Sequence, residues 1–170
     1  MTSWQDLRNA APELAQRAEA AFTATTNAVL ATIRKDVSPR VSGIDPMFYD
    51  DELWLGSMPN ARKADDLLRD PRMALHCVPW ESRPKGDDGV AAAGSLDAKL
   101  TGRAVDITDE ATIKRVMGRH FEEIGQDAPA EGNLFRIDIE RLTTIHVEDE
   151  KFLVVESWSP DGGVVRVKRD

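Results

Sequence analysis

Short apolar segments separated by turn residues recur along most of the chain, and this pattern constrains the fold more than any other feature. Segments rich in β-formers predict six to eight strands, at 28–34, 39–49, 52–57, 73–80, 98–107, 134–142, 144–158 and 164–170. Helical spacing of apolar residues is confined to three segments, near 3–26, 61–69 and 113–125. Because the strands follow one another through short turns, the sequence predicts an α+β protein with an antiparallel barrel or sandwich.

Length and charge narrow the class of protein further. The 170 residues predict one domain, with an N-terminal helix at 1–26, a barrel core at 27–157 and a C-terminal strand or tail at 158–170. A net charge of −8 argues against a nucleic-acid partner, since binding phosphate backbones needs a dense basic face. The sequence shows no secretory signal and no apolar run of about 18 residues, so we expect a cytoplasmic protein with no membrane partner.

Catalysis by protein side chains has little support in the sequence. The three histidines, His76, His120 and His146, are far apart and lack partners at metal-ligand spacing, so no metal site is predicted. His120 lies on the apolar face of a helix and is interpreted as a core or interface residue. Cys77, the single cysteine, is interpreted as a buried structural thiol. No catalytic residue is identified, and an enzyme of this sequence would rely on a cofactor.

Two adjacent cations, Arg62 and Lys63, stand near the start of the short helix predicted at 61–69. With Asn60 as the expected N-cap, they occupy the second and third helical positions, where backbone N–H groups have no intrahelical acceptor. Free amides, the positive end of the helix dipole and two cations together favour a dianionic phosphate.

The same pair has a plainer interpretation. Arg62 and Lys63 could form exposed ion pairs with the acidic residues that follow them, Asp65, Asp66 and Asp70. Such pairs contribute only about 0.2–1 kcal/mol. If a phosphate is bound instead, these acidic residues are expected on the solvent face of the helix.

The order of these features resembles the pyridoxamine 5′-phosphate oxidase-like superfamily, whose members are flavin- and deazaflavin-binding split β-barrels. The resemblance runs from about residue 27 to residue 107 and rests on the segments VLATIRKDVSPRVSGI, ELWLGSMPNARKADDLLRDPRMALHC and LTGRAV. It implies a six-stranded antiparallel split β-barrel with flanking helices. It also implies a homodimer with the cofactor at the subunit interface.

The resemblance assigns cofactor-binding roles to eleven residues. Lys63 and Arg62 would hold the cofactor phosphate. The other residues would line the ring system or reach the phosphate or the ribityl chain: Arg40, Val41, Ser42, Gly43, Thr32, Ile33, Arg34, Gly56 and Ser57. Some of these have other interpretations, since Ile33 and Val41 could be core residues and Arg40 a surface residue after a turn.

Two departures from the family pattern affect the expected activity. The C-terminus lacks the Arg-Leu-His-type substrate motif of the true oxidases, so oxidation of pyridoxamine phosphate is not expected. The glycine-rich segment 81–97 has no counterpart that can be aligned. We therefore expect a small-molecule substrate and assign it to no narrower class.

The resulting hypothesis is an oxidoreductase that uses FMN, or alternatively the deazaflavin coenzyme F-420, to transfer hydride to or from a small organic substrate. Two alternatives stay open: a non-catalytic cofactor carrier or sensor, and a dimeric split-barrel module that binds no cofactor. The aromatic candidates for a dimer interface, each of which could equally be a core residue, are Trp54, Trp80, Phe121 and Trp158.

Overall fold

The computed structural model describes residues 1–78, 97–149 and 151–169. Within these ranges the chain forms four helices and nine strands: α1 (Trp4–Ala10), α2 (Pro12–Thr23), β1 (Ala28–Ile33), β2 (Pro39–Ile44), β3 (Pro46–Tyr49), β4 (Glu52–Ser57), α3 (Arg62–Arg69), β5 (Arg72–Cys77), β6 (Asp97–Ile107), α4 (Glu110–Glu123), β7 (Asn133–Glu148), β8 (Phe152–Ser159) and β9 (Gly163–Arg169).

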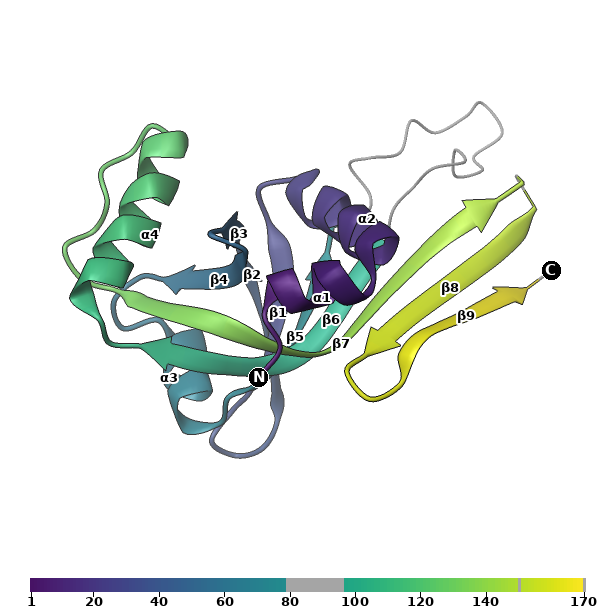
Figure 1. Cartoon of the computed structure of the whole chain (residues 1–170). Helices are drawn as coiled ribbons and strands as arrows, with labels where there is room; N and C mark the ends of the chain where they lie inside the picture. Colours follow the sequence, from purple (N-terminus) through teal and green to yellow (C-terminus); the bar gives the residue numbers. More distant parts are fainter. Residues whose placement is uncertain (79–96, 150, 170) are drawn as a thin grey trace, which may run out of the picture.

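All described strands belong to one antiparallel sheet, ordered β2-β1-β5-β6-β7-β4-β3, with β8 paired to β7 and β9 paired to β8 (Figure 1). The 16-residue strand β7 makes this order possible, because its first residues pair with β4, its last residues pair with β8, and β6 pairs along most of its length. The prediction of an antiparallel α+β fold is confirmed. The structure has nine strands in the described ranges, whereas the resemblance implied six. The pairings between the described strands form an open sheet rather than a closed barrel.

Three predicted elements are divided in the structure. The N-terminal helix breaks where Ala11 leaves the helical region, with a φ of −145°, and Pro12 starts α2. The strand predicted at 39–49 becomes β2 and β3, because the chain turns at Asp45 and the two parts pair with different strands, β1 and β4. The strand predicted at 144–158 is interrupted near Asp149, whose φ is +54°.

The main core lies between the sheet and the two N-terminal helices. The helices α1 and α2 bury Trp4, Leu7 and Phe22 against the sheet (Figure 1). A smaller core lies under α4, where Met117 and Val116 pack with Trp54. The strand β4 contributes to both cores, because its successive side chains alternate: Leu53 and Leu55 lie in the main core and Trp54 in the smaller one.

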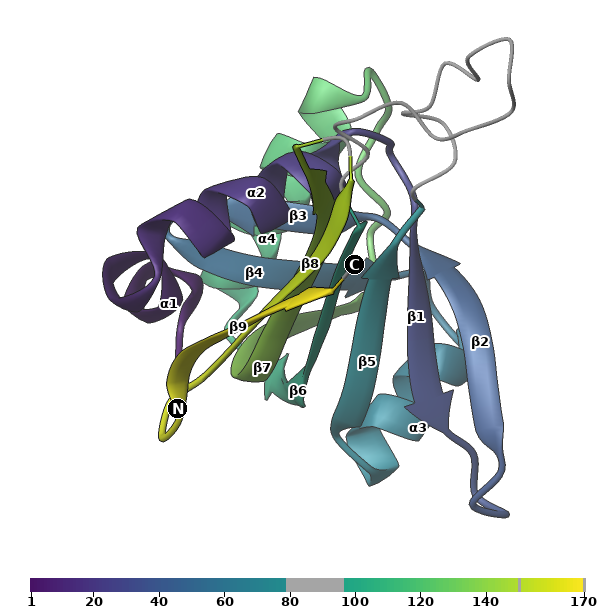
Figure 2. The same ribbon diagram turned by 90° about the vertical axis from the view of Figure 1, so that its right-hand side faces the viewer.

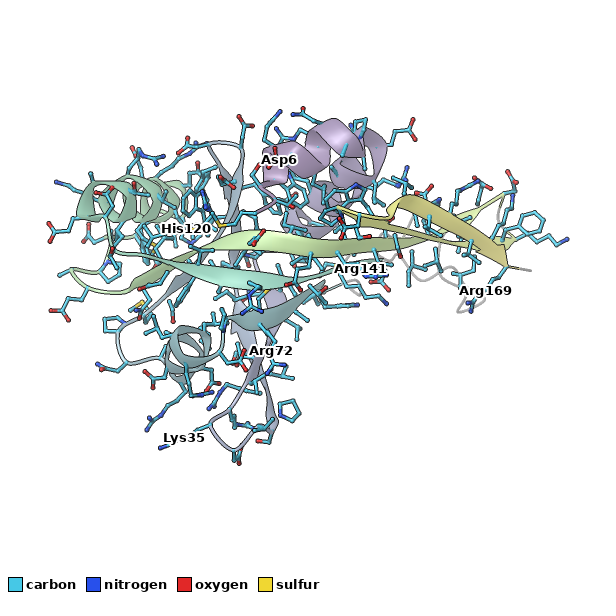
Figure 3. All side chains as sticks on the ribbon, turned by 60° about the horizontal axis from the view of Figure 1, so that its bottom comes forward. Asp6, Lys35, Arg72, His120, Arg141 and Arg169 are labelled. Atoms are coloured by element: carbon cyan, nitrogen blue, oxygen red, sulfur yellow. The ribbon has the colours of Figure 1, made fainter. Side chains whose placement is uncertain are left out.

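The helix α3 lies at the end of the sheet formed by β1, β2 and β5, on the opposite side of the molecule from α1 and α2 (Figure 2). The hairpin of β8 and β9 extends away from the rest of the chain, and the β9 side chains are exposed. Two charged side chains lie at the edges of the molecule: Lys35 at the turn after β1, and Arg169 at the far end of β9 (Figure 3). None of the helices in the described ranges has the length and hydropathy needed to cross a bilayer.

Candidate functional site

A cavity of about 550 Å³ lies where the ends of β2 and β4 meet the start of α3 and the inner face of α4. We call it the Lys63 cavity. One wall is polar and includes Lys63, Asp45 and Ser57, whereas α4 supplies an apolar wall that includes Met117 and Phe121. A cavity of this size with a few converging polar groups is typical of small-molecule sites.

Lys63 connects two elements at the polar wall. Its Nζ donates a hydrogen bond of 2.6 Å to the carbonyl oxygen of Gly43, at the end of β2. Burial lowers the pKa of Lys63 from its ordinary value, and the negative charge of Asp45 opposes this shift. A cation held in a partly desolvated position gains more from a bound anion than one in open water.

Ser57 and Gly56 end β4 at the same cavity. The Ser57 Oγ atom is buried and has no hydrogen-bond partner among the described residues. A buried hydroxyl without a partner costs about 1–3 kcal/mol, so a ligand that bonds to it is favoured. Gly56 packs closely against α4, since a Cβ atom there would lie 2.9 Å from Met117 Sδ, and the methionine side chain would have to shift to admit it.

The start of α3 differs from the prediction. The N-cap residue is Ala61, not Asn60, and no side chain caps the helix. Asn60 has a φ of +59°, which places it in the turn before the cap and outside capping position. As a result, Arg62 and Lys63 occupy the first and second helical positions, and the first-turn N–H groups receive no side-chain acceptor.

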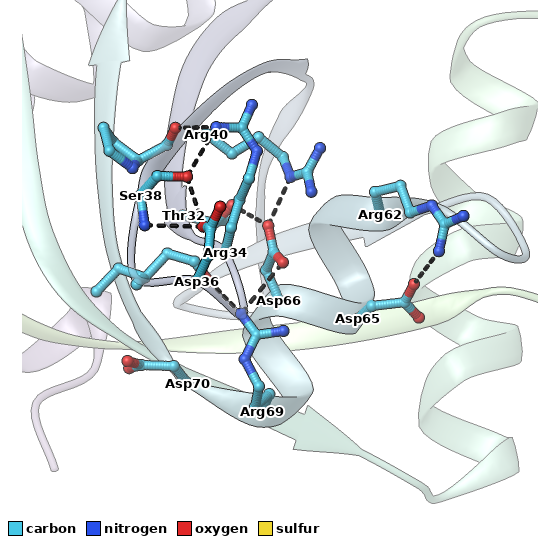
Figure 4. A network of polar contacts seen from close by, with 12 residues as sticks. Thr32, Arg34, Asp36, Ser38, Arg40, Arg62, Asp65, Asp66, Arg69 and Asp70 are labelled. Atoms are coloured by element: carbon cyan, nitrogen blue, oxygen red, sulfur yellow. Dashed lines mark hydrogen bonds and ion pairs between the residues drawn. The ribbon is translucent and has the colours of Figure 1, made fainter.

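The acidic residues of α3 do not all face solvent, contrary to the expectation. Asp66 is 3 % exposed. It accepts hydrogen bonds from Thr32 Oγ1 at 2.9 Å, Arg40 Nε at 2.6 Å and Arg69 at 3.2 Å (Figure 4). Burial opposes the ionisation of Asp66, but these hydrogen bonds outweigh it and lower its pKa. We call these four residues the Asp66 cluster.

Arg62 lines a different hollow from Lys63, one that it shares with residues of the Asp66 cluster. It is largely exposed and lies 3.6 Å from Asp65, the plainer pairing considered from the sequence (Figure 4). Arg34 belongs to the same region, where it donates hydrogen bonds to Ser38 and to the carbonyl oxygen of Pro39. Arg34, Arg40 and Arg62 therefore line a second hollow, separate from the Lys63 cavity.

The run 40–43 divides between the two faces of β2, because successive strand residues point to opposite sides. Arg40 turns inward to Asp66, whereas Val41 is 69 % exposed. Ile33 contributes its carbonyl oxygen to Arg69. Of the eleven predicted residues, the Lys63 cavity thus brings together only Lys63, Gly43, Gly56 and Ser57.

The contribution of α4 was missed in the sequence. His120 lines the Lys63 cavity, edge-to-face with Phe121 at a ring-centroid distance of 5.6 Å. The apolar stripe of α4 predicted a helix at 113–125, but no local signal in the sequence shows which strand this helix covers.

Other expectations concern buried residues. Cys77 is buried, as predicted. Trp54 and Trp158 are core residues, which is the second of the two interpretations considered for them. Trp80 and nearly all of the segment 81–97 lie outside the described residues.

Fold and site together define an α+β protein with a mixed polar and apolar cavity at one end of an antiparallel sheet. Residues 14–146 match the sequence model of the family described as pyridoxamine 5′-phosphate oxidase. The chain belongs to this family, which confirms the resemblance found in the sequence. No curated protein matches the chain.

Several solved structures share the fold at low identity. One is PhzG from Burkholderia lata in complex with tetrahydrophenazine-1-carboxylic acid, with a TM-score of 0.61, 12% identity, and coverage of 98% of this chain and 95% of that chain. Another is a pyridoxamine 5′-phosphate oxidase-related, FMN-binding protein from Nostoc punctiforme, with a TM-score of 0.58, 10% identity, and coverage of 96% and 97%. A third is HutZ, a haem storage protein from Vibrio cholerae, with a TM-score of 0.56, 18% identity, and coverage of 77% and 90%.

Proposed function

We propose that this protein is an oxidoreductase that binds FMN, or alternatively coenzyme F-420, in the Lys63 cavity and acts on a small organic substrate. The observation that carries this proposal is the pairing of Lys63 and the unpartnered Ser57 hydroxyl on one wall with an apolar wall opposite. A flavin has the same division, with an anionic phosphate at one end and a flat apolar ring system at the other. The FMN-binding neighbour of the same fold supports the choice of cofactor.

The residues of this chain would act mainly by positioning. Lys63, Ser57 and the uncapped first turn of α3 would hold the phosphate, while Met117 and Phe121 on α4 would cover the ring. When bound, a flavin or deazaflavin supplies hydride-transfer chemistry that no side chain provides. The apolar α4 wall would exclude water, and His120 would lie beside a substrate bound at that wall.

The proposed dimer would form on the outer face of β1 and β2. This face carries Val29 and Val41, which are 37 % and 69 % exposed, and the open backbone of Gly43. The register places these residues on one side of the hairpin, since Val29 pairs with Gly43 and Val41 with Ala31. Gly43 also lines the Lys63 cavity, so a second copy on this face would close the cavity from outside.

Cofactor binding can be tested by titrating the purified full-length protein with FMN and with coenzyme F-420, following fluorescence and melting temperature. We expect Lys63→Ala to weaken binding by one to two orders of magnitude in Kd, because one charge-assisted contact contributes roughly 1.5–3 kcal/mol. Arg62→Ala is the matched control: it removes the neighbouring cation, which lies in the other hollow.

The variants locate the phosphate, and the behaviour of the wild-type protein distinguishes the oxidoreductase from the two alternatives. A larger loss in Arg62→Ala than in Lys63→Ala would move the phosphate to the hollow beside the Asp66 cluster. Binding of neither cofactor would favour the dimeric module. Tight binding with no reduction by any donor and no reoxidation by any acceptor would favour a carrier or sensor.

A further inference from the structure

Three side chains with metal-binding atoms meet at the end of β5 and the start of β6, away from the Lys63 cavity. His76 and Cys77 end β5, and Asp97 begins β6. One nitrogen, one sulfur and one oxygen atom, each from a different side chain, all lie within 4.8 Å of one another. The strands pair side by side in an antiparallel ladder (Figure 2), so the backbone itself holds the three residues together.

The contacts of His76 fix its tautomer. The Nδ1 atom lies 2.6 Å from the carbonyl oxygen of Cys77, which can only accept, so Nδ1 carries a proton. In the neutral ring Nε2 then holds a lone pair, and it lies 3.0 Å from Asp97 Oδ1. An imidazole whose second nitrogen is bound to a backbone carbonyl is the usual arrangement of a metal-ligating histidine.

Asp97 Oδ1 is buried and has no hydrogen bond to a described residue, although Nε2 is close. Two acceptor atoms at this separation repel each other unless a cation lies between them. A metal ion that both atoms bind would supply this cation. The sulfur of Cys77, within 4.8 Å of a ligand atom of each of the other two residues, would give such an ion a third ligand.

Cys77 would supply the sulfur ligand of this group. Its Sγ accepts a hydrogen bond of 3.2 Å from the backbone N–H of Ala98. Burial raises the pKa of the thiol, and this N–H acts in the opposite direction by stabilising the thiolate. A bound divalent cation would deprotonate the thiol at neutral pH.

We propose that His76, Cys77 and Asp97 form a binding site for a divalent transition metal of the zinc class. A mixed set of imidazole, thiolate and carboxylate suits Zn²⁺, with ligand distances of about 2.0–2.3 Å. Tetrahedral coordination at these distances separates the ligand atoms by about 3.4–3.6 Å. Atoms at the 4.8 Å limit would need to approach by about 1.2–1.4 Å, and His76 Nε2 and Asp97 Oδ1, now 3.0 Å apart, would separate by about 0.4 Å. His76 and Asp97 are partly exposed, which allows this movement and gives the ion a path to the buried sulfur.

Titration of the reduced, metal-free full-length protein with Co²⁺, followed by displacement with Zn²⁺, tests the site. We expect one Co²⁺ per chain and a sulfur-to-cobalt charge-transfer band in the near ultraviolet. Because the chain contains a single cysteine, this band can arise only from Cys77. Absence of the band at millimolar Co²⁺ would overturn the proposal.

Variants identify the other two ligands. We expect His76→Gln and Asp97→Asn each to weaken Co²⁺ binding at least about tenfold, since even residues outside the ligand shell can have such effects. The matched controls His146→Gln and Asp106→Asn should leave the titration unchanged. Cys77→Ser should abolish the band; because this buried residue could be needed for folding, the two partly exposed ligand variants carry the decision. A band that persists unchanged in both would also overturn the proposal.

Discussion

At the scale of single residues, Asp66 connects α3 to the hairpin of β1 and β2, which lies far from it in the sequence. Thr32, Arg40 and Arg69 all donate to its carboxylate, and the carboxylate itself is buried. Breaking a buried pair by removing one partner leaves the other charge without compensation, which costs more than losing an exposed pair. The cluster is therefore expected to stabilise the position of α3 against β1 and β2.

We expect Asp66→Asn to lower the free energy of unfolding by about 3 kcal/mol. Asp65→Asn is the control on the same helix, because Asp65 is exposed and its contact with Arg62 is 3.6 Å long. Its effect should stay within about 0.5 kcal/mol. Urea unfolding of both variants measures the difference, and equal losses would contradict the assigned role of Asp66.

The same residue predicts a pH dependence. Burial acts to raise the pKa of Asp66, but the hydrogen bonds from Arg40, Thr32 and Arg69 prevail and lower it in the folded protein. A lowered folded pKa means that the contribution is fully present above the ordinary value of about 3.9 and is lost as pH falls through the folded pKa. The stability difference between the wild type and Asp66→Asn should therefore stay constant above about pH 5 and shrink as the pH falls below about 4. A difference that also stays constant below about pH 4 would rule out ionised Asp66 as its cause.

At the scale of elements, a bulge between Thr101 and Gly102 shifts the register of β6 against β7. A Cβ atom on Gly102 would lie 2.3 Å from the carbonyl oxygen of Asp138, in the backbone of β7. The contact is with the backbone, so no side chain can move aside to relieve it. The absence of a side chain at Gly102 thus keeps the two longest strands paired through the bulge.

We expect Gly102→Ala to destabilise the protein by about 1–3 kcal/mol through overpacking. Gly118→Ala is the opposite case, since nothing lies within 4 Å of the added carbon and the residue is inside α4. It should stabilise the protein by about 0.5–1 kcal/mol, because alanine loses less backbone entropy in a helix. Thermal unfolding of the two variants gives the signs, and a stable Gly102→Ala protein would show that β7 can move away.

At the scale of the whole molecule, the proposed dimer depends on the uncovered face of β1 and β2. We expect the protein to sediment as a dimer at micromolar concentration and Val41→Asp to shift it toward monomer, because the charge would be buried in the interface. Val165→Asp is the matched control, because Val165 is also an exposed valine, on strand β9 outside the proposed interface. Monomeric wild-type protein, or dissociation only in the control, would exclude this face as the interface.

The sequence by itself determined much of the local structure. Period-two alternation located β4 and placed Leu53 and Leu55 on one face and Trp54 on the other, because a strand imposes its own geometry on its side chains. The structure shows that these faces belong to two different cores. The ordered motifs between residues 27 and 107 also indicated the family that the match over residues 14–146 shows. Such signals are local in the chain, and no tertiary contact is needed to detect them.

Only the tertiary structure decided which residues meet. Arg62 and Lys63 are adjacent in sequence, yet the helix directs them to different hollows, and Asp66 is buried by partners up to 34 residues away. His76, Cys77 and Asp97 showed no metal-ligand spacing, because antiparallel pairing of β5 with β6, rather than a short motif, brings them within 4.8 Å. Strand pairing and helix docking are set by the burial of the whole chain, so a reading of neighbouring residues cannot predict these contacts.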